Sequence, residues 1–332
     1  MTNTVHSRGQ PGFASRWLAL LALCVGLACR PQPPAQTLKV QLGWIPDAHH
    51  AGFYVALEKG FYQNHGLAVT LVPGGPEVDP VKVVASQTAD IGQAGGIEQV
   101  IQARTHGFPI LAFATIHRDT PHALISLERN PIRNEKDLPG KRIAVAYGDA
   151  AEVLFKAYLR KAHVDPASIT MVPFRFDLSQ LTNGEVDAVT GFKTDQPASL
   201  RVLGFPAVVL SYSSQGIRSY GYTLFTTEAF RGTNETVIQA FNSASREGFA
   251  YTFAHPQEAI AILKKWTKAG FNEKSERRKL ELISTLMVDT DGILNDWNLD
   301  TERVQGVEEF LRGEGQLKQA PEIDTIFRNL PR

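Results

Sequence analysis

Cysteine is nearly absent from this chain of 332 residues: there are 2, Cys24 and Cys29, and both lie near the N-terminus. The remaining sequence has no thiol that could form an internal disulfide, bind a metal or act as a nucleophile. We therefore expect no metal site and no cysteine-dependent catalysis.

An excess of charge of one sign is also missing. Acidic and basic residues number 34 each, and no long run of Lys or Arg occurs. The sequence lacks the electrostatic footprint of a nucleic-acid binder, so nucleic acid is not an expected partner. With 43% hydrophobic residues, the chain can bury a full core, and its length suits two lobes of the usual domain size.

Long hydrophobic runs are few, and the clearest one, residues 17–28, follows Arg8 and Arg16. It is too short to span a bilayer comfortably, but it has the length of a signal-peptide core. The run leads into Gly26-Leu27-Ala28-Cys29, which resembles a bacterial lipobox except that Gly26 stands where Leu is usual. We interpret residues 1–29 as a lipoprotein signal peptide with Cys29 as the lipidation site. An ordinary cleaved signal is the alternative.

Residues 30–37 are rich in proline and show no periodicity, as in a semi-rigid tether. Folded structure is therefore expected to begin near Leu38. An exported chain held to the membrane by a lipid would reside in the cell envelope.

The rest of the sequence alternates short apolar runs with helical patterns, which indicates an α/β fold with mostly parallel sheets. Strands are expected at residues 38–42, 69–72, 90–92, 110–115, 141–146, 170–172, 187–190 and 220–227. Helices are expected at residues 51–59, 81–86, 97–105, 152–162 and 178–181, and the chain beyond Asn234 is mainly helical.

Two stretches share one detail: a helix ends a tight turn before Asp90 and before Asp187, and each aspartate opens a buried strand. A duplicated α/β lobe explains this more simply than coincidence. The pattern predicts a discontinuous first lobe, residues 38–119 plus 217–332, around a second lobe, residues 120–216. The carboxyl ends of the strands in two such sheets would line one cleft, where ligands bind.

Five segments resemble the family of periplasmic-type binding proteins for thiamine pyrimidine precursors: residues 43–62, 89–92, 103–116, 137–143 and 184–188. That family includes relatives for sulfonates, nitrate and riboflavin, and a fungal pyrimidine synthase. The resemblance implies the two-lobed type II periplasmic-binding-protein fold, often called the Venus flytrap. It also implies a monomer that delivers a small ligand to the permease and ATPase subunits of an ABC importer.

In relatives, a Trp-x-Pro-x-x-x-His segment after the first strand contributes to the ligand pocket. Here it corresponds to Trp44, Pro46 and His50. An indole can stack on a planar ring, an imidazole can exchange a hydrogen bond with a ring nitrogen, and Asp47 could accept from an exocyclic amine. Trp44 could instead lie in the core, and His50 or Asp47 could cap the first helix.

Further candidates follow other strands. Gly95 and Gly96 would let the backbone approach a ligand, unless they only form a turn. Side chains near helix N-termini or after strands could contact it directly: Tyr147, Asp149, Phe192, Thr194, Asp195 and Tyr222. A helix N-terminus offers free N–H groups to acceptors near Tyr147 and Asp149, while a core or hinge role is the alternative for Tyr222.

The resemblance also bears on catalysis, because the synthases use a lysine that carries pyridoxal phosphate, a histidine four residues later and a cysteine-rich iron motif. The corresponding positions here are Ala94, Glu98 and residues 219–223, which supply none of these groups. We expect a binding protein without a cofactor. An exported enzyme with an unrecognised site and a sensor domain are the other classes.

The sequence leaves several ligands open. A thiamine pyrimidine precursor is the first expectation, and riboflavin, an organic sulfonate or nitrate are alternatives, because Gly43 and Asp47 differ from the residues common in pyrimidine-binding relatives. Arg118 and Arg175 would suit a sulfonate, but the sequence does not place them inside or outside the cleft.

Overall fold

The computed structural model describes residues 1–4, 35–267, 270–288, 293–313, 315–317 and 319–331. The chain divides into two compact units, Met1–Ala35 and Gln36–Arg332. Most of the expected signal peptide, including Cys29, and most of the expected tether lie outside the described residues. No described helix has both the length and the apolar character needed to cross a membrane.

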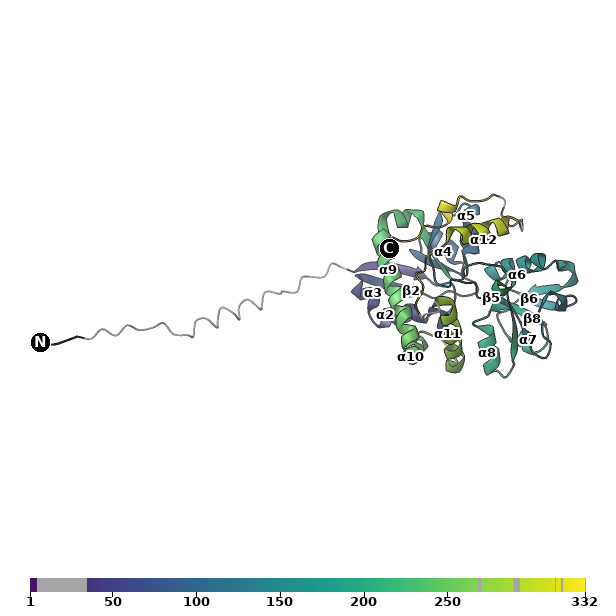
Figure 1. Ribbon diagram of the computed structural model, residues 1–332, viewed down its shortest axis with the longest axis horizontal. Coiled ribbons are helices and arrows are strands. Elements are labelled where there is room, and N and C mark those ends of the chain that lie inside the picture. The colour runs from purple at the N-terminus through teal and green to yellow at the C-terminus, as the bar shows by residue number, and fades with distance from the viewer. Residues whose placement is uncertain (5–34, 268–269, 289–292, 314, 318, 332) are drawn as a thin grey trace. The chain divides into compact units, whose positions relative to one another are not determined.

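The second unit contains two five-stranded sheets (Figure 1). The first sheet has the order β2-β1-β3-β10-β4, with strands β1 (Gln36–Gln41), β2 (Leu67–Val72), β3 (Ile91–Ala94), β4 (Ile110–Thr115) and β10 (Thr223–Thr227). The second has the order β7-β6-β8-β5-β9, with strands β5 (His122–Leu127), β6 (Arg142–Val145), β7 (Thr170–Pro173), β8 (Ala188–Phe192) and β9 (Ala207–Ser211). Strand β1 begins two residues before Leu38 and so includes the end of the expected tether.

Both sheets are mixed. Strand β1 runs parallel to β2 and β3, whereas β10 lies antiparallel between β3 and β4. Likewise β6 runs parallel to β7 and β8, and β5 lies antiparallel between β8 and β9. In each sheet four of the five strands run in the same direction, which confirms the expectation of mostly parallel sheets; the one antiparallel strand, β10 or β5, is the strand that follows a crossing between the lobes.

The two sheets share an aspartate interaction at the start of corresponding strands. The backbone N–H of Lys39 donates to Asp90 Oδ2 at 2.7 Å, and the Asp90 N–H donates to the Lys39 carbonyl at 2.9 Å. Arg142 and Asp187 repeat both bonds at 2.8 Å. The matched strand order and the matched aspartates support the duplication that the sequence indicated.

Helices lie beside both sheets, at α2 (Ala51–Glu58), α3 (Phe61–Asn64), α4 (Pro80–Ala85), α5 (Ile97–Thr105), α6 (Ala150–Lys161), α7 (Ser179–Thr182), α8 (Gln196–Val202), α9 (Glu228–Ala254), α10 (Pro256–Trp266), α11 (Glu273–Met287), α12 (Thr301–Gly313) and α13 (Ile323–Ile326). Side-chain caps begin several of them: Asp79 accepts from the first turn of α4, Asp149 from α6 and Asn272 from α11. The cap at Asp149 explains why α6 begins at Ala150, two residues before the expected start.

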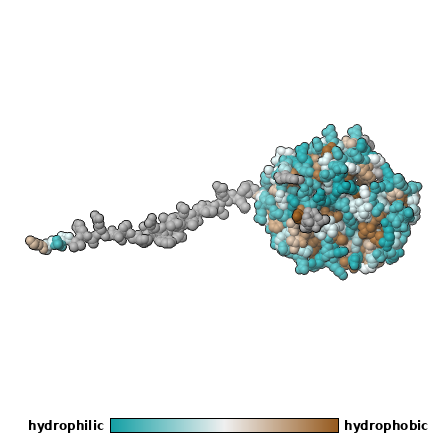
Figure 2. All heavy atoms as spheres, viewed as in Figure 1, coloured by the Kyte–Doolittle hydropathy of each residue, from teal (hydrophilic) through white to brown (hydrophobic). Residues whose placement is uncertain are grey.

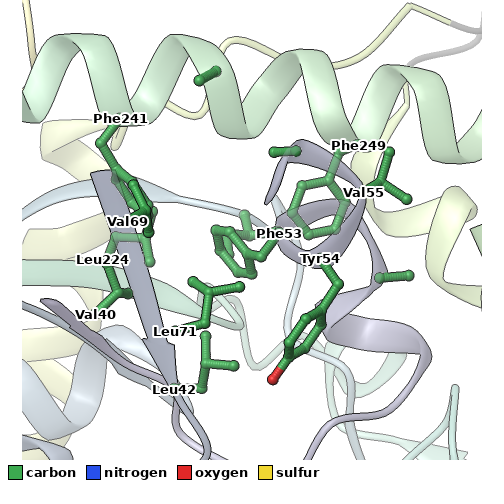
Figure 3. Close-up of a cluster of buried hydrophobic side chains, with 14 of the residues drawn as sticks. Val40, Leu42, Phe53, Tyr54, Val55, Val69, Leu71, Leu224, Phe241 and Phe249 are labelled. Carbon is green, nitrogen blue, oxygen red and sulfur yellow. The ribbon is translucent and has the colours of Figure 1, made fainter. Parts of the chain in front are cut away.

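Helices α2 and α9 cover the first sheet and form the largest core. Figure 3 shows Phe241 and Phe249 of α9 directed toward Phe53 of α2 and toward strand residues such as Val69 and Leu224. The ring of Phe53 stacks on Phe241 at 6.0 Å and meets Phe249 edge-on at 5.2 Å. This core holds the C-terminal helices on the first sheet and makes that lobe discontinuous in sequence.

Two segments connect the lobes: residues 116–121, between β4 and β5, and residues 212–222, between β9 and β10. We call them the crossing segments. The strands of the first sheet lie at residues 36–115 and 223–227, and those of the second at residues 122–211. The exact division at residues 119/120 and 216/217 stays a prediction. The face drawn in Figure 2 is largely hydrophilic with scattered hydrophobic residues.

Candidate ligand cleft

A cleft of about 970 Å³ lies where strand ends of both sheets converge. Its walls include the loops after β1 and β3 of the first sheet and the loops after β6 and β8 of the second. These are carboxyl ends of parallel strands, where open α/β sheets bind their ligands. The volume lies within the range typical of small-molecule sites.

Eight of the eleven expected ligand-binding residues line this cleft: Trp44, Asp47, Gly95, Tyr147, Asp149, Phe192, Asp195 and Tyr222. His50, Gly96 and Thr194 are not among its lining residues. His50 is fully buried, with Nδ1 on Asp47 at 2.8 Å and Nε2 on Gln93 Oε1 at 3.0 Å. Thr194 bonds to His49 Nε2 at 2.9 Å, and a Cβ on Gly96 would meet the Glu98 carboxylate.

His49, which sequence reasoning passed over, lines the cleft in place of His50. The two histidines lie in a single 3-10 turn, residues Ala48–His50, and its cap Asp47 accepts from the backbone N–H of His49 at 3.0 Å. The other Asp47 oxygen lies 3.3 Å from His49 Nδ1. Burial acts to raise the pKa of Asp47, but its interactions with His49 and His50 outweigh burial and hold the pKa well below its usual value. Asp47 is therefore a helix cap and histidine partner that also faces the cleft.

Aromatic side chains reach the cleft from both lobes. Trp44 lies in the loop after β1 and Phe176 in the loop after β7. Their ring centroids are 4.8 Å apart, and the ring planes are inclined by 49°. Phe176 also contacts Phe174 at 5.1 Å, and both line the cleft. Phe176 is 43% exposed and has a left-handed backbone conformation with a φ of 55°. Phe174 and Phe176 were not among the expected site residues, although their position after a predicted strand could have indicated that they line the cleft.

Lys279 of α11 joins the lobes at another part of the cleft wall. Its Nζ lies 2.6 Å from Asp195 Oδ1, at the start of α8, and 2.8 Å from Glu276 Oε1. Glu276 also accepts from the backbone N–H of Ala48 at 2.7 Å. Burial lowers the pKa of Lys279, but Asp195, Asp47 and Glu276 outweigh it and raise the pKa overall. Ser199 of α8 and Ser275 of α11 add a contact at 3.3 Å.

The cleft is acidic. Its described lining residues include six carboxylates, Asp47, Glu77, Asp79, Asp149, Asp195 and Glu276, but only one lysine, Lys279, and no arginine. Both arginines considered for a sulfonate lie elsewhere: Arg175 pairs with Glu185 at 2.7 Å and Arg118 lines a separate cavity. The cleft therefore offers an anionic ligand no unpaired arginine or lysine among these residues.

Asp149 is a carboxylate of the cleft that remains only lightly engaged by protein. As the cap of α6 it accepts from the backbone N–H of Ala151 at 3.4 Å, and the backbone N–H of Ala150 also interacts with it. Burial raises the pKa of Asp149. Behind the neighbouring loop, burial also raises the pKa of Glu98 to about 7, and Glu98 accepts a hydrogen bond from Ser219. A partly buried carboxyl beside a cavity, bonded only to backbone N–H groups, is suited to accept from a ligand amine.

Two further histidines lie in the protein interior beside the cleft. His117 stacks on Tyr222 at 5.2 Å, and His122 lies edge-on to Phe192 at 4.7 Å. Both ring nitrogens of His117 and Nε2 of His122 lack a hydrogen-bond partner among the described residues. Burial lowers the pKa of His122 to about 3, and burial followed by the neighbouring histidines lowers that of His117.

We expect His122→Asn to reduce the loss of stability in mild acid. The unfolded chain protonates this side chain near pH 6.5, whereas the folded chain resists protonation down to about pH 3, so stability falls as the pH drops through this window. At pH 5 the difference amounts to about 2 kcal/mol for one histidine. Urea unfolding at pH 7.5 and pH 5 measures it. The exposed His163→Asn is the control, and an equal effect of both substitutions would contradict this assignment.

A family model described as NMT1/THI5 like matches residues 47–259, more than half of the chain. The chain belongs to the NMT1/THI5-like family. The match includes every strand from β2 to β10 and so covers most of both lobes.

Relatives of this NMT1/THI5-like chain include both binding proteins and synthases. A formylaminopyrimidine-binding protein of Halalkalibacterium halodurans is 24% identical over 74% of this chain and 75% of its own. The riboflavin-binding protein RibY of Chloroflexus aurantiacus is 25% identical over 90% and 86%. A 4-amino-5-hydroxymethyl-2-methylpyrimidine phosphate synthase of Legionella pneumophila is 24% identical over 77% and 82%.

Among solved structures, the periplasmic aliphatic sulphonate binding protein SsuA from Escherichia coli matches with a TM-score of 0.70. The identity is 16%, over 90% of this chain and 93% of the other. At this identity the likeness concerns the fold alone. It confirms the two-lobed α/β architecture of periplasmic binding proteins expected from the sequence.

Proposed function

We propose that this chain is the substrate-binding protein of an ABC importer and that its cleft takes a neutral or cationic planar heterocycle, with an aminopyrimidine precursor of thiamine as the first candidate. One observation carries the proposal: aromatic side chains from both lobes and several carboxylates line a cleft in which the described residues include no arginine. An organic sulfonate or nitrate would need compensating cations there.

The aromatic residues supply the affinity in this proposal. A flat ring that packs against Trp44 or Phe176 would bury one of its faces, and an aromatic contact adds about 0.5 to 1.5 kcal/mol beyond the burial of area. An aminopyrimidine of roughly ten heavy atoms needs about 0.8 kcal/mol per atom for micromolar binding, which is below the ceiling for small ligands. No metal or cofactor is required.

The carboxylates supply the specificity. Asp47 is already engaged by the side chains of His49 and His50, whereas Asp149 lines the cleft and has no side-chain partner among the described residues, only backbone N–H groups of α6. Asp149 is therefore our choice for the acceptor of an exocyclic amine, with Tyr147 beside it. Four more of the expected contacts line the cleft and would surround the ligand: Gly95, Phe192, Asp195 and Tyr222.

Contacts that span the cleft support binding by lobe closure. Trp44 with Phe176, His49 with Thr194, and Lys279 with Asp195 each join a residue of the first lobe to one of the second. Opening the lobes about the crossing segments would break all three and expose a ligand to solvent, while closing would bury it. The closed form would be the one that the permease recognises.

A binding role is favoured over catalysis. Ala94 is a buried residue of β3 that cannot form an imine, and Glu98 is buried beside Ser219. Among the described residues, no group of three or more His, Cys, Asp or Glu side chains could hold a metal ion. Together with the lipobox-like Gly26–Cys29, the kinship with binding proteins supports an exported, lipid-anchored monomer in the cell envelope.

Calorimetry with a ligand panel tests this function. We expect 4-amino-5-hydroxymethyl-2-methylpyrimidine or its formylamino relative to bind with micromolar affinity or better, and alkanesulfonates and nitrate to give no measurable heat. Riboflavin as the tightest ligand would keep the importer role and replace the pyrimidine. Tight binding of a sulfonate would overturn the ligand assignment, and conversion of a bound compound would overturn the binding-protein role.

A further inference from the structure

A second cavity, of about 770 Å³, lies between α6 of the second lobe and α12 of the first. It shares no lining residue with the ligand cleft. Both crossing segments contribute to its wall, through Arg118 on one side and residues 216–220 on the other. We call it the basic cavity.

Basic side chains dominate its lining. Five of them face the cavity from four different segments, Arg118, Arg160, Lys161, Arg218 and Arg303, against two acidic residues, Asp300 and Glu302. This concentration contrasts with a whole chain of net charge zero and with the acidic cleft. A concave site lined mainly by one sign of charge focuses its field and attracts counter-ions.

Protein carboxylates leave most of this charge uncompensated. Arg118, Lys161, Arg218 and Arg303 form no ion pair with a carboxylate among the described residues. Asp300 caps α12: its Oδ1 accepts a hydrogen bond from the backbone N–H of Arg303 at 2.9 Å. The helix dipole accounts for Arg160 and Lys161 in the last turn of α6, but not for the three arginines on other segments.

The position of Arg303 is fixed by its neighbours. Its guanidinium donates to the carbonyl of Arg118 and lies over the ring of Tyr220, 4.9 Å from the ring centre. The Tyr220 hydroxyl in turn accepts from the backbone N–H of Asp300 at 2.7 Å. A guanidinium oriented in this way loses little freedom when it binds an oxyanion.

Apolar residues complete the lining. Leu154 of α6, Ile217 of the second crossing segment, and Val307 and Phe310 of α12 all contribute to it. The volume is much larger than an inorganic phosphate requires. Arginine side chains match the geometry of phosphate oxygens, while the apolar residues offer a surface to an organic group.

We propose that the basic cavity is a second binding site, for a phosphate monoester or diester with an apolar portion. Such a group is found both in soluble phosphate esters and in the headgroups of anionic lipids. An occupant would contact both crossing segments, and so would lie against the part of the chain that connects the lobes.

Calorimetry at low ionic strength with inorganic pyrophosphate as the probe tests the site. We compare the wild-type protein with Arg118→Gln/Arg218→Gln and with Arg133→Gln/Arg201→Gln. All four arginines are exposed, and each double variant removes two positive charges, but only the first pair lines the basic cavity. We expect at least about fivefold weaker binding in the first variant and wild-type binding in the second.

Sedimentation with vesicles distinguishes the two sources of the phosphate. Phosphatidylglycerol in phosphatidylcholine is compared with phosphatidylcholine alone, using the same two variants. If phosphatidylglycerol binding is lost only in Arg118→Gln/Arg218→Gln, the result supports a lipid headgroup. If the wild-type protein binds pyrophosphate but not the phosphatidylglycerol vesicles, the result supports a soluble ester. The proposal is overturned if neither probe binds, or if both double variants weaken binding equally.

Discussion

Trp44→Ala is expected to lower the affinity for the cleft ligand by at least about tenfold, because it removes both the stacking surface and the apolar area of the indole. Trp44 is partly exposed and meets Phe176 of the opposite lobe at 4.8 Å, so its truncation leaves the lobe cores intact. The loss should appear mainly as faster dissociation. Titration calorimetry and stopped-flow fluorescence with the best ligand of the panel measure both quantities.

Two further variants sharpen this result. Phe176→Ala should weaken binding to a similar degree, since it removes the ring that faces Trp44 from the other lobe. Leu203→Ala removes an exposed apolar side chain that does not line the cleft and should leave the affinity unchanged. An unchanged dissociation constant in Trp44→Ala would exclude this residue from the ligand pocket.

Gly248→Ala is expected to destabilise the protein by about 3 kcal/mol, near the upper end for overpacked cores. Gly248 lies where α9 crosses α2, and a Cβ at this position would meet the carbonyl oxygen of Gly52 at 2.1 Å and the Cβ of Ala56 at 2.8 Å. The obstacle is backbone, so the helices themselves must separate. The midpoint of urea unfolding, with its slope, measures the cost.

Gly232→Ala, in the short part of α9 that precedes a kink at Asn234, is the control. Nothing lies within 4 Å of a Cβ built at Gly232, so alanine should be neutral or stabilise the helix by up to about 1 kcal/mol. If the two substitutions change the free energy of unfolding equally, close packing of α2 on α9 is not what requires glycine at position 248.

Periodicity located most of the elements. Helix α5 and strand β4 have the expected bounds, and α2 ends within one residue of its expected end. Strands β5 and β9 were missed. Every residue of β5, His122–Leu127, is buried, so the strand has no polar alternation to mark it, and its histidine and serine disguise the apolar run. Strand β5 is the antiparallel strand of the second sheet, and β9 pairs with β5 at the edge of that sheet.

Local sequence patterns also predicted only some of the residues that line the cleft. Residues directly after strands were predictable as lining because strand ends determine where a loop lies, and Trp44 and Phe192 follow this rule. Which of two adjacent histidines faces the cleft depends on the orientation of one 3-10 turn. Lys279 was not among the expected site residues, and only the folded chain places it 2.6 Å from Asp195.

By itself the sequence determined the α/β class, the duplicated lobes and the exclusion of thiol chemistry, because these depend on local periodicity and on composition. The tertiary structure alone decided that the cleft is acidic and aromatic, that Arg118 lies in a separate basic cavity, and that Lys279 connects the lobes. The physical reason is that charge complementarity acts through space: it depends on which segments, distant along the chain, approach within a few ångströms after folding.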